Sequence, residues 1–398
     1  MISTGAEPLA FVLKLAAVCN LNCSYCYVYN KGDDSWRRRP AFMSAAVVEA
    51  AAARIRAHAQ LSGQRKVRII FHGGEPCLIG AEAFELICRR LRTALGDIGH
   101  IHFALQTNGT LLTPDWIRVL RTQGIVVGVS LDASREIHDR DRVTHGGRPS
   151  YDGIVEGLRH MTASAAVFDL LSVIPLGGDG AAAYRNLASL GPRSIDFLLP
   201  DYTHDDIAIV RERYGPTPCA DFLIPAFEEW WSSGAIDLRI GLFWSMTRVI
   251  LGAESDVDLL GNQPLRFVFV ETDGEIQPLD VLRVCGPNFN GTPLNVLDHD
   301  FCELAQANPT LAQTVFGGMP LASGCAGCAE RETCAGGYLP HRFSRARGFD
   351  NPSVWCADLL ALFTHMRSRL DVGVGETARL RHEAAAEGGP RDLVEARP

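Results

Sequence analysis

The sequence has no long run of apolar residues. No segment approaches the roughly 20 consecutive apolar residues that a membrane-spanning helix needs. A signal-peptide pattern is also missing, because no basic region precedes the apolar stretch from Leu9 to Val18 and Lys14 interrupts that stretch. These absences predict a cytoplasmic protein with no membrane partner.

Basic residues are fewer than acidic residues in this chain. The chain has 38 Lys and Arg residues against 46 Asp and Glu residues, a formal net charge of −8. Surfaces that bind nucleic acid usually need clustered Lys and Arg side chains. The main basic cluster is Arg37–Arg39, and so short a run is typical of a solvated turn. We therefore expect no nucleic-acid partner.

Cysteine, by contrast, is abundant, with 12 residues in a chain of 398. Disulfides are rare in the cytoplasm, so this number indicates metal binding or catalysis. One group of cysteines lies near the N-terminus and a larger group lies in the last third of the chain. Cys77, Cys88 and Cys219 stand apart from both groups and are expected to be apolar core residues.

The first 200 residues alternate between strand-like and helix-like patterns. Ser44 is a predicted helix cap, and Thr113 followed by Pro114 marks another helix start. Such alternation predicts parallel strands with helices outside, an incomplete (β/α)6 form of the TIM barrel over residues 1–200. Catalytic groups of this fold gather at the C-terminal ends of the strands. The six expected strands are Ala10–Ala17, Val67–Phe71, Ile101–Thr107, Ile125–Leu131, Phe168–Ile174 and Ile195–Leu199.

Three further regions follow the predicted barrel. Residues 201–265 are expected to form a helical bridging region, whose Trp230, Trp231, Phe243 and Trp244 favour a packed core, with a substrate-binding wall as the alternative. Residues 266–370 are expected to form an auxiliary domain that opens with a hairpin at Asp273-Gly274, a strong turn signal, and closes with a helix. Residues 371–398, rich in Gly, Ala, Glu and Arg, are predicted to be disordered.

Cys19, Cys23 and Cys26 form a C-x3-C-x2-C pattern directly after the first expected strand. Three thiolates on one short loop are able to hold three irons of a [4Fe–4S] cluster and leave the fourth iron open. An open iron binds a small molecule, which a fully coordinated cluster does not. The alternative is a zinc loop or a set of buried thiols, although zinc sites usually add a second cysteine pair or His.

This pattern, with the aromatic Tyr25 before the last cysteine, resembles the signature of the radical S-adenosylmethionine (SAM) superfamily. Gly73-Gly74-Glu75 resembles the family's motif at the methionine amino group, and a carboxylate suits an ammonium. The resemblance implies a cluster with an open iron, bound SAM and an external electron donor of the flavodoxin or ferredoxin kind. The SAM-contacting residues that it implies are Tyr25, Gly73, Gly74, Glu75, Gln106, Asn108, Ser130, Asp132 and Arg142.

Some of these residues have simpler interpretations. Gly73-Gly74 after a strand is often only a turn, and Ser130 is equally well an ordinary hydroxyl at a strand end. Arg142 suits the SAM carboxylate as a bidentate donor, but a surface salt bridge is the alternative.

The C-terminal cysteines Cys325, Cys328, Cys334 and Cys356 resemble the SPASM domain of radical SAM peptide-modifying enzymes. Four thiolates would fully ligate one auxiliary [4Fe–4S] cluster, with a four-cysteine zinc site as the alternative. Typical SPASM domains carry two auxiliary clusters. Here Tyr338 and Leu279 stand where the family has cysteines, and Cys285 and Cys302 alone hold a cubane poorly. We therefore expect a single auxiliary cluster.

Two segments, Cys334–Ser344 and Gly348–Leu359, are similar to the FxsB, XYE and Grr-type maturases, which build three-residue cyclophanes in ribosomal peptides. The resemblance implies that a deoxyadenosyl radical removes a Cβ hydrogen and that the carbon radical attacks a nearby aromatic ring of a precursor peptide. Asp280 is the candidate for accepting the ring proton or holding the peptide, with an exposed hairpin aspartate as the alternative. A thioether- or formylglycine-forming SPASM maturase and a non-catalytic iron–sulfur or zinc protein are the other hypotheses.

Overall fold

The computed structural model describes residues 9–235, 237–255, 257–260 and 263–386. The chain divides into two compact units. The barrel unit comprises Met1–Pro175, Ala182–Asp201 and Pro264–Met319, and the helical unit comprises Leu176–Ala181, Tyr202–Gln263 and Pro320–Pro398. The predicted auxiliary region 266–370 is thus divided, because its first part packs with the barrel strands.

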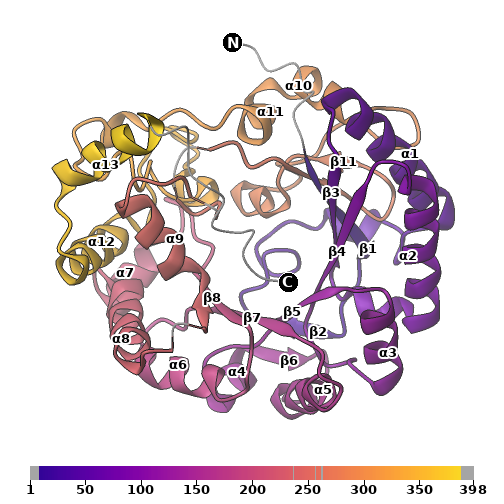
Figure 1. Ribbon diagram of the computed structural model, residues 1–398, viewed down its shortest axis with the longest axis horizontal. Coiled ribbons are helices and arrows are strands. Elements are labelled where there is room, and N and C mark those ends of the chain that lie inside the picture. Colours follow the sequence, from indigo (N-terminus) through magenta and orange to yellow (C-terminus); the bar gives the residue numbers. More distant parts are fainter. Residues whose placement is uncertain (1–8, 236, 256, 261–262, 387–398) are drawn as a thin grey trace. The chain divides into compact units, whose positions relative to one another are not determined.

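Six parallel strands form the core of the barrel unit, in the order of the chain (Figure 1). Their parallel pairing confirms the α/β architecture expected from the alternating pattern. Buried residues alternate along five of these strands, whereas β1 is buried almost throughout, as expected for a strand covered on both faces. The strands are β1 (Ala10–Ala16), β3 (Lys66–Gly73), β4 (His100–Thr107), β5 (Val126–Ser130), β7 (Phe168–Val173) and β8 (Ser194–Leu198).

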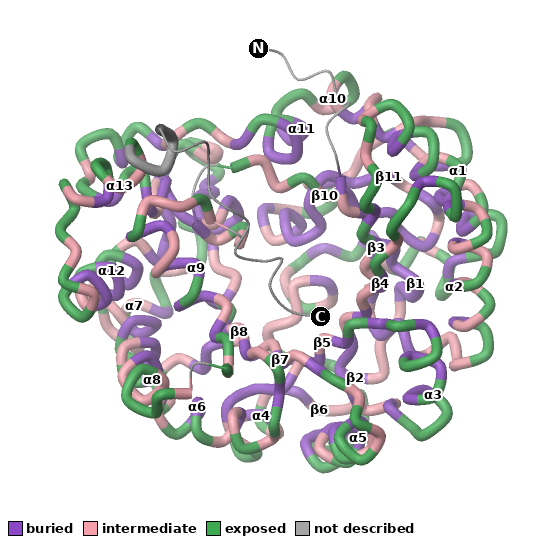
Figure 2. The backbone as a smooth tube through the Cα atoms, in the orientation of Figure 1, coloured by how far each residue is buried: buried purple, intermediate pink, exposed green. Residues whose placement is uncertain are grey.

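Helices on the outer side connect these strands. Ser44 caps the first helix through Val47 N, and Thr113 caps the third through Trp116 N, as predicted. Each of these helices alternates buried and exposed residues, which fits a single face packed on the sheet (Figure 2). The helices are α1 (Ala45–Ser62), α2 (Ala81–Leu95), α3 (Pro114–Thr122), α4 (Arg135–Asp141), α5 (Tyr151–Ala163) and α6 (Gly180–Ala188), with short 3₁₀ turns at η1 (Ser35–Arg38) and η2 (Pro76–Ile79).

A hairpin from the last third of the chain extends the barrel sheet. β10 (Phe267–Val270) and β11 (Ile276–Gln277) are antiparallel and are joined through Asp273-Gly274, as the Asp-Gly signal predicts. β10 also pairs in parallel with β1, with Ala10 opposite Phe267. The 3₁₀ helices η3 (Asp280–Cys285) and η4 (Phe301–Glu303) follow, with α10 (Leu304–Ala307) and α11 (Pro309–Phe316). This pairing brings residues near 270–285 to the edge of β1.

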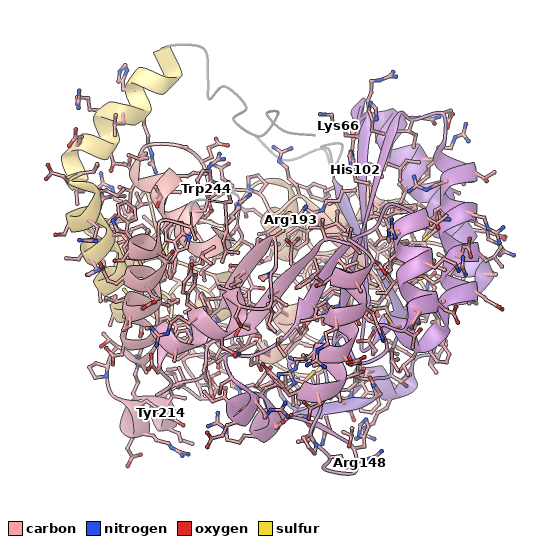
Figure 3. All side chains as sticks on the ribbon, turned by 60° about the horizontal axis from the view of Figure 1, so that its bottom comes forward. Lys66, His102, Arg148, Arg193, Tyr214 and Trp244 are labelled. Carbon is pink, nitrogen blue, oxygen red and sulfur yellow. The ribbon has the colours of Figure 1, made fainter. Side chains whose placement is uncertain are left out.

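A short strand within the cysteine loop pairs with a second short strand in antiparallel fashion. β2 (Leu21–Cys23) pairs with β6 (Arg142–Thr144), and Cys23 lies opposite Arg142. Figure 3 shows the two ends of the barrel unit. Lys66 and His102, at the starts of β3 and β4, lie at one end, and Arg148, after β6, lies at the other. The cysteine loop follows the C-terminal end of β1, where a barrel of this kind carries its active site.

The helical unit contains the second cysteine group. Phe243 is fully buried, so the predicted packed core is present there, whereas Trp231 and Trp244 are 39% and 42% exposed. An arginine lies over each exposed ring, Arg369 over Trp231 and Arg239 over Trp244. The elements are α7 (Ala208–Tyr214), α8 (Pro218–Ser233), β9 (Arg239–Ile240), α9 (Gly241–Ile250), η5 (Ser323–Cys325), η6 (Leu339–Arg342), α12 (Cys356–Leu370) and α13 (Val374–Ala386).

The prediction of a disordered tail from residue 371 is wrong for Val374–Ala386, which form α13. Thr377 explains the order, because its buried hydroxyl donates to the Ile250 carbonyl of α9 at 2.7 Å. Arg367 of α12 in turn donates to the same hydroxyl at 2.8 Å. The rest of the predicted tail, 387–398, lies outside the described residues.

Candidate active site

Three free cysteines lie on the loop after β1. The amide of Cys26 donates to the Cys23 carbonyl at 3.1 Å and closes a tight turn. Burial raises the pKa of all three thiols, and for Cys19, where the neighbouring cysteines add to the rise, the pKa reaches about 12. Thiols in such surroundings become thiolates only beside a positive charge, which the irons of a cluster supply. The donor set therefore fits an iron–sulfur cluster.

An asparagine network holds the cysteine loop to the end of β4. The side-chain amide of Asn108 donates to Asn20 Oδ1 at 2.8 Å and approaches Cys19 Sγ at 3.7 Å. Asn20 donates to the Thr110 hydroxyl at 2.8 Å, and that hydroxyl donates back to Asn108 at 2.7 Å. The structure thus gives Asn108 a contact with Cys19, one of the predicted cluster ligands, while its predicted contact with SAM stays a prediction.

The glycines of Gly73-Gly74 allow β3 to pass very close to the loop after β1. A Cβ atom on Gly74 would lie 2.0 Å from the Tyr29 hydroxyl and 2.3 Å from the Val18 carbonyl oxygen. Gly73 has a φ of +141°, and a Cβ there would lie 2.3 Å from the Ala16 carbonyl oxygen. The pair is therefore more than a turn, because no larger residue fits between these two loops.

Glu75 is fully buried and its carboxylate ties two loops together. It accepts hydrogen bonds from the Cys77 amide at 2.9 Å, the Thr107 hydroxyl at 2.7 Å and the Asn108 amide at 2.7 Å. The predicted contact of Glu75 with the methionine ammonium stays a prediction. The structure adds a second role, which is to anchor the loop after β4.

Gln106 and Ser130 meet at the C-terminal ends of β4 and β5. The Gln106 amide donates to the Ser130 hydroxyl at 2.9 Å. Both side chains therefore lie on the same side of adjacent strands, where the sequence places SAM contacts. Ser130 is thus more than an isolated strand-end hydroxyl.

Tyr25, Asp132 and Arg142 form a chain of hydrogen bonds beside the cysteine loop, in which Asp132 and Arg142 are buried. Arg142 donates to the Tyr25 hydroxyl at 2.8 Å, and Tyr25 donates to the Asp132 carboxylate. Arg142 is 7% exposed, so the surface salt bridge considered for it is wrong. Its Nε–H is shielded from solvent and has no partner among the described residues. An unpaired buried guanidinium donor is suited to a carboxylate ligand.

A group of buried charges fills the interior near the ends of β1 and β3. Lys14 Nζ lies 2.9 Å from Glu271 and 2.8 Å from Asp280 Oδ2, and Tyr27 donates to the same Asp280 oxygen at 2.8 Å. Burial raises the pKa of Asp280, but Lys14, His72 and Arg283 outweigh this effect and lower it to about 2. Asp280 is 3% exposed, so the alternative of an exposed hairpin aspartate is wrong.

Two arginines complete this interior group. Arg283 pairs with Glu271 at 2.8 Å and with Asp33 at 3.2 Å, and these side chains are almost fully buried. Arg39 lies 3.7 Å from the buried Glu271 and also pairs with the partly exposed Asp273 and Glu275. Buried charges are tolerated when they are paired and hydrogen-bonded in this way.

His72 is a residue of this site that the sequence reasoning missed. It lies opposite Lys14 in the β1–β3 register. Burial and Lys14 lower its pKa, while Asp280 and Glu271 raise it, with a net decrease that leaves the ring neutral. Its Nδ1 atom is shielded from solvent and has no hydrogen-bond partner within the described residues. The available signal was its position directly before Gly73-Gly74, on the face of β3 opposite to the buried Ile69 and Phe71.

In the helical unit, one pocket is lined by all four C-terminal cysteines, together with Arg331 and Pro352. Burial raises the pKa of these thiols where a shift is resolved, with Cys334 reaching about 12. Cys325, Cys328, Cys334 and Cys356 thus share one place, as an auxiliary cluster requires. Cys285 and Cys302 belong to the barrel unit, in η3 and η4.

The segment whose sequence suggested cyclophane maturases packs its aromatic side chains together within this unit. The rings of Tyr338 and His341 meet edge to face at 5.1 Å, and His341 also contacts the buried Trp355.

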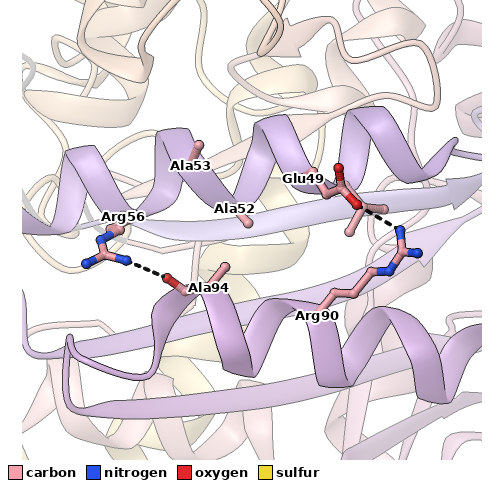
Figure 4. A pocket seen from close by; sticks show the side chains of 7 residues that line it. Glu49, Ala52, Ala53, Arg56, Arg90 and Ala94 are labelled. Atoms are coloured by element: carbon pink, nitrogen blue, oxygen red, sulfur yellow. Dashed lines mark hydrogen bonds and ion pairs between the residues drawn. The ribbon is translucent and has the colours of Figure 1, made fainter.

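A pocket on the outer side of the barrel unit lies between α1 and α2 (Figure 4). Three of its seven lining residues are alanines, and its two arginines already have hydrogen-bond or ion-pair partners. Arg90 pairs with Glu49 at 3.0 Å, and Arg56 donates to the Ala94 carbonyl at 3.2 Å. It contains none of the predicted site residues.

Comparison with known proteins supports the radical SAM resemblance of the residues in this site. Residues 13–178 match the radical SAM superfamily model, so this part of the chain is a radical SAM domain. The chain is 24% identical over 373 residues to the cysteine-type anaerobic sulfatase-maturating enzyme of Clostridium perfringens, which covers 91% of this chain and 97% of that enzyme. It is 31% identical over 199 residues to the serine-type enzyme of Klebsiella aerogenes, and that match spans 46% of the Klebsiella enzyme. The chain is therefore a homologue of anaerobic sulfatase-maturating enzymes.

Solved structures show the same fold. A histidine-tagged anSMEcpe with bound AdoMet superposes with a TM-score of 0.76 at 22% identity, over 95% of this chain and 99% of that one. The native anSMEcpe with AdoMet and the Cp18Cys peptide gives a TM-score of 0.73 at 21% identity, over 94% of this chain and 100% of that one. No helix among the described residues is long and apolar enough to cross a bilayer.

Proposed function

We propose that this protein is a radical SAM enzyme that oxidises the Cβ of a residue in a peptide or protein substrate. The first reaction to consider is the conversion of a serine or cysteine side chain to formylglycine. The observation that carries it is the match along 97% of the Clostridium perfringens sulfatase-maturating enzyme. Because of this match, we favour the formylglycine reaction over the crosslink that the sequence motifs suggested.

The residues present fit the two cofactors of this chemistry. Cys19, Cys23 and Cys26 would hold a [4Fe–4S] cluster, and the four C-terminal cysteines would hold an auxiliary one. With SAM bound, the first cluster supplies a 5′-deoxyadenosyl radical that removes a hydrogen atom from the substrate.

Residues at the strand ends would bind SAM. Arg142 offers its unpaired Nε–H to the carboxylate, and Tyr25 and Asp132 hold the guanidinium in place. Gln106 and Ser130 present amide and hydroxyl groups at the neighbouring strands. An external flavodoxin- or ferredoxin-like protein would deliver the electron that starts each turnover.

A second candidate reaction is the cyclophane crosslink between an aromatic side chain and the Cβ of a nearby residue. The observation that favours it is the smaller number of cysteines than in typical SPASM domains. Leu279, directly before Asp280, and Tyr338 stand where those domains have cysteines.

The test is an anaerobic reaction of the reconstituted, reduced protein with SAM and the Cp18Cys peptide or its serine counterpart. Formylglycine is detected by mass spectrometry after trapping the aldehyde with hydroxylamine, and the Cys19/Cys23/Cys26→Ala variant is the control. In parallel, the protein is co-expressed with any short peptide that is found encoded beside its gene. A trapped aldehyde supports the first reaction, and a ring-linked product that has lost two hydrogens supports the second. A sulfur-linked product, or absence of SAM cleavage, contradicts both.

A further inference from the structure

Arg342, in the helical unit, is a buried cation whose hydrogen bonds all go to neutral groups. Its side chain is 3% exposed. The guanidinium donates to the backbone carbonyls of Pro320 at 2.7 Å, Phe349 at 3.1 Å and Asn351 at 3.3 Å, and no carboxylate of the described residues lies within ion-pair distance of it. An arginine keeps its charge in a protein interior. These bonds therefore fix the position of the group without neutralising it.

The guanidinium packs against the wall of the cysteine pocket. Gly336 lines that pocket together with the four C-terminal cysteines. A Cβ atom on Gly336 would lie 3.6 Å from Nε and 3.7 Å from Cζ of Arg342, so the charged group lies directly behind this glycine. Burial raises the pKa of the Cys325 thiol, and Arg342 opposes that rise. The field of the buried cation thus reaches the sulfur atoms.

The carboxylates near the pocket already have arginine partners. The pairs are Glu330 with Arg367 at 2.7 Å, Asp358 with Arg211 at 3.0 Å, Asp350 with Arg347 at 3.2 Å and Glu332 with Arg381 at 3.2 Å. Asp350 also attracts Arg342, but Asp350 is exposed, and water and salt screen its charge. Arg342 is therefore a cation that the neighbouring carboxylates leave largely uncompensated.

A [4Fe–4S] cluster on four thiolates is an anion, and reduction adds one more negative charge to it. A fixed cation in a buried position stabilises the reduced form more than the oxidised form, because the surrounding medium screens it poorly. We propose that Arg342 raises the reduction potential of the auxiliary cluster and so makes that cluster an acceptor for the electron released by substrate oxidation. This inference rests on the proposed function, in which the four C-terminal cysteines hold the cluster.

Oxidation of a serine side chain to formylglycine shows how the electron is balanced. The serine Cβ gives one hydrogen atom to the deoxyadenosyl radical. The resulting carbon radical then forms the carbonyl double bond, as its hydroxyl proton goes to solvent and one electron goes to the oxidised auxiliary cluster. The substrate has then lost two hydrogens, and the cluster has gained one electron.

The experiment measures the potential of the auxiliary cluster in the full chain. The Cys19/Cys23/Cys26→Ala background removes the signal of the first cluster. The protein is reconstituted anaerobically and titrated with titanium(III) citrate against dye mediators, and the reduced cluster is followed by electron paramagnetic resonance. Arg342→Gln and Arg342→Lys are compared with Arg331→Gln. Arg331 is the matched control, because it lines the same pocket but is 53% exposed and lies 3.8 Å from Glu332.

Arg342→Gln should lower the ratio of reduced to oxidised cluster at a fixed potential about tenfold. For a one-electron couple, this corresponds to a shift of about 59 mV to a more negative potential. Arg342→Lys keeps the positive charge and should keep most of the potential. Arg331→Gln should shift it less, since solvent screens an exposed charge. Iron content shows that each variant still holds the cluster.

Several results would overturn the role of Arg342. The role is excluded by an unchanged potential in Arg342→Gln, by equal shifts in Arg342→Gln and Arg331→Gln, or by a lysine variant as low as the glutamine variant. If Arg342→Gln loses iron, Arg342→Met, which keeps an apolar stem, replaces it. Loss of iron in the lysine variant as well makes Arg342 a structural residue. Loss in both neutral variants, with iron kept by lysine, supports the need for the charge.

Failure of the proposed function is visible separately. A background protein without iron–sulfur absorption overturns the auxiliary cluster itself. A chain that shows the shift in potential but modifies no peptide overturns the proposed reaction and leaves the effect of Arg342 in place.

Discussion

Lys14 Nζ and Asp280 Oδ2 lie 2.8 Å apart inside the barrel unit, although 266 positions separate them in the chain. The contact exists because β10 pairs with β1 and carries the following turn to the end of β1. It makes Asp280 a strongly ionised, buried carboxylate. Its surroundings therefore favour electrostatic stabilisation over proton uptake.

Anaerobically purified protein should contain two [4Fe–4S] clusters, or about eight irons by cubane stoichiometry. Replacing Cys19, Cys23 and Cys26 together with alanine should remove about half of the iron and all SAM cleavage. The corresponding change at Cys325, Cys328, Cys334 and Cys356 should remove the other half. Iron analysis and absorption spectra measure both. Stoichiometric zinc without iron–sulfur absorption would contradict this assignment, and about twelve irons would show a further cluster at Cys285 and Cys302.

Glu75→Gln should weaken SAM binding and also lower the melting temperature. The amide cannot accept all three hydrogen bonds that the carboxylate accepts, and an unsatisfied buried donor costs about 1–3 kcal/mol. Thr107→Val removes one of those bonds and leaves the carboxylate unchanged, so it should lower the melting temperature alone. SAM titration and thermal melting separate the two effects. Equal SAM affinity in all three proteins would leave Glu75 with only its structural role.

Lys14→Met should destabilise the barrel unit, because it leaves Glu271 and Asp280 without their shared cation. Removing one partner of a buried ion pair costs about 3–5 kcal/mol. Arg135→Met, which breaks an exposed ion pair with Asp152, is the control and should cost little. Chemical unfolding measures both. A small effect at Lys14 would show that the carboxylates are stabilised by Arg283 and solvent.

Stability should also fall in acid as Asp280 is protonated. Its folded pKa of about 2 lies below the ordinary value of 3.8, so its contribution is present above pH 3.8 and is lost as the pH falls toward 2. Comparison with Asp280→Asn isolates this term, because the variant lacks the titrating group. A pH dependence that is the same in both proteins over this range would argue against the lowered pKa.

Gly74→Ala should prevent assembly of the first cluster. The added methyl group would meet the Tyr29 hydroxyl at 2.0 Å and the Val18 carbonyl at 2.3 Å, so the cysteine loop must shift. Gly153→Ala in α5 is the matched control, because its methyl group would meet nothing within 4 Å. That change should be neutral or stabilising by up to about 1 kcal/mol. Iron analysis shows whether the first cluster assembles. A normal iron content in Gly74→Ala would show that the loop tolerates the shift.

Local patterns determined much of this protein. The six barrel strands, the caps at Ser44 and Thr113 and the turn at Asp273-Gly274 follow from periodicity, capping and turn chemistry, which act over a few residues. The spacing of Cys19, Cys23 and Cys26 indicated the cluster for the same reason, since three ligands on one loop need no distant partner.

Only the tertiary structure decided where the remaining groups act. The parallel pairing of β10 with β1 joins segments more than 250 residues apart, and no short pattern specifies such a partner. It converts Asp280 from a hairpin residue into a buried partner of Lys14 and places His72 among charges. Burial of Arg142 opposite Cys23 and the docking of α13 through Thr377 likewise depend on neighbours distant in sequence. The pKa and accessibility of a side chain follow from all surrounding elements, so they are set only when the chain has folded.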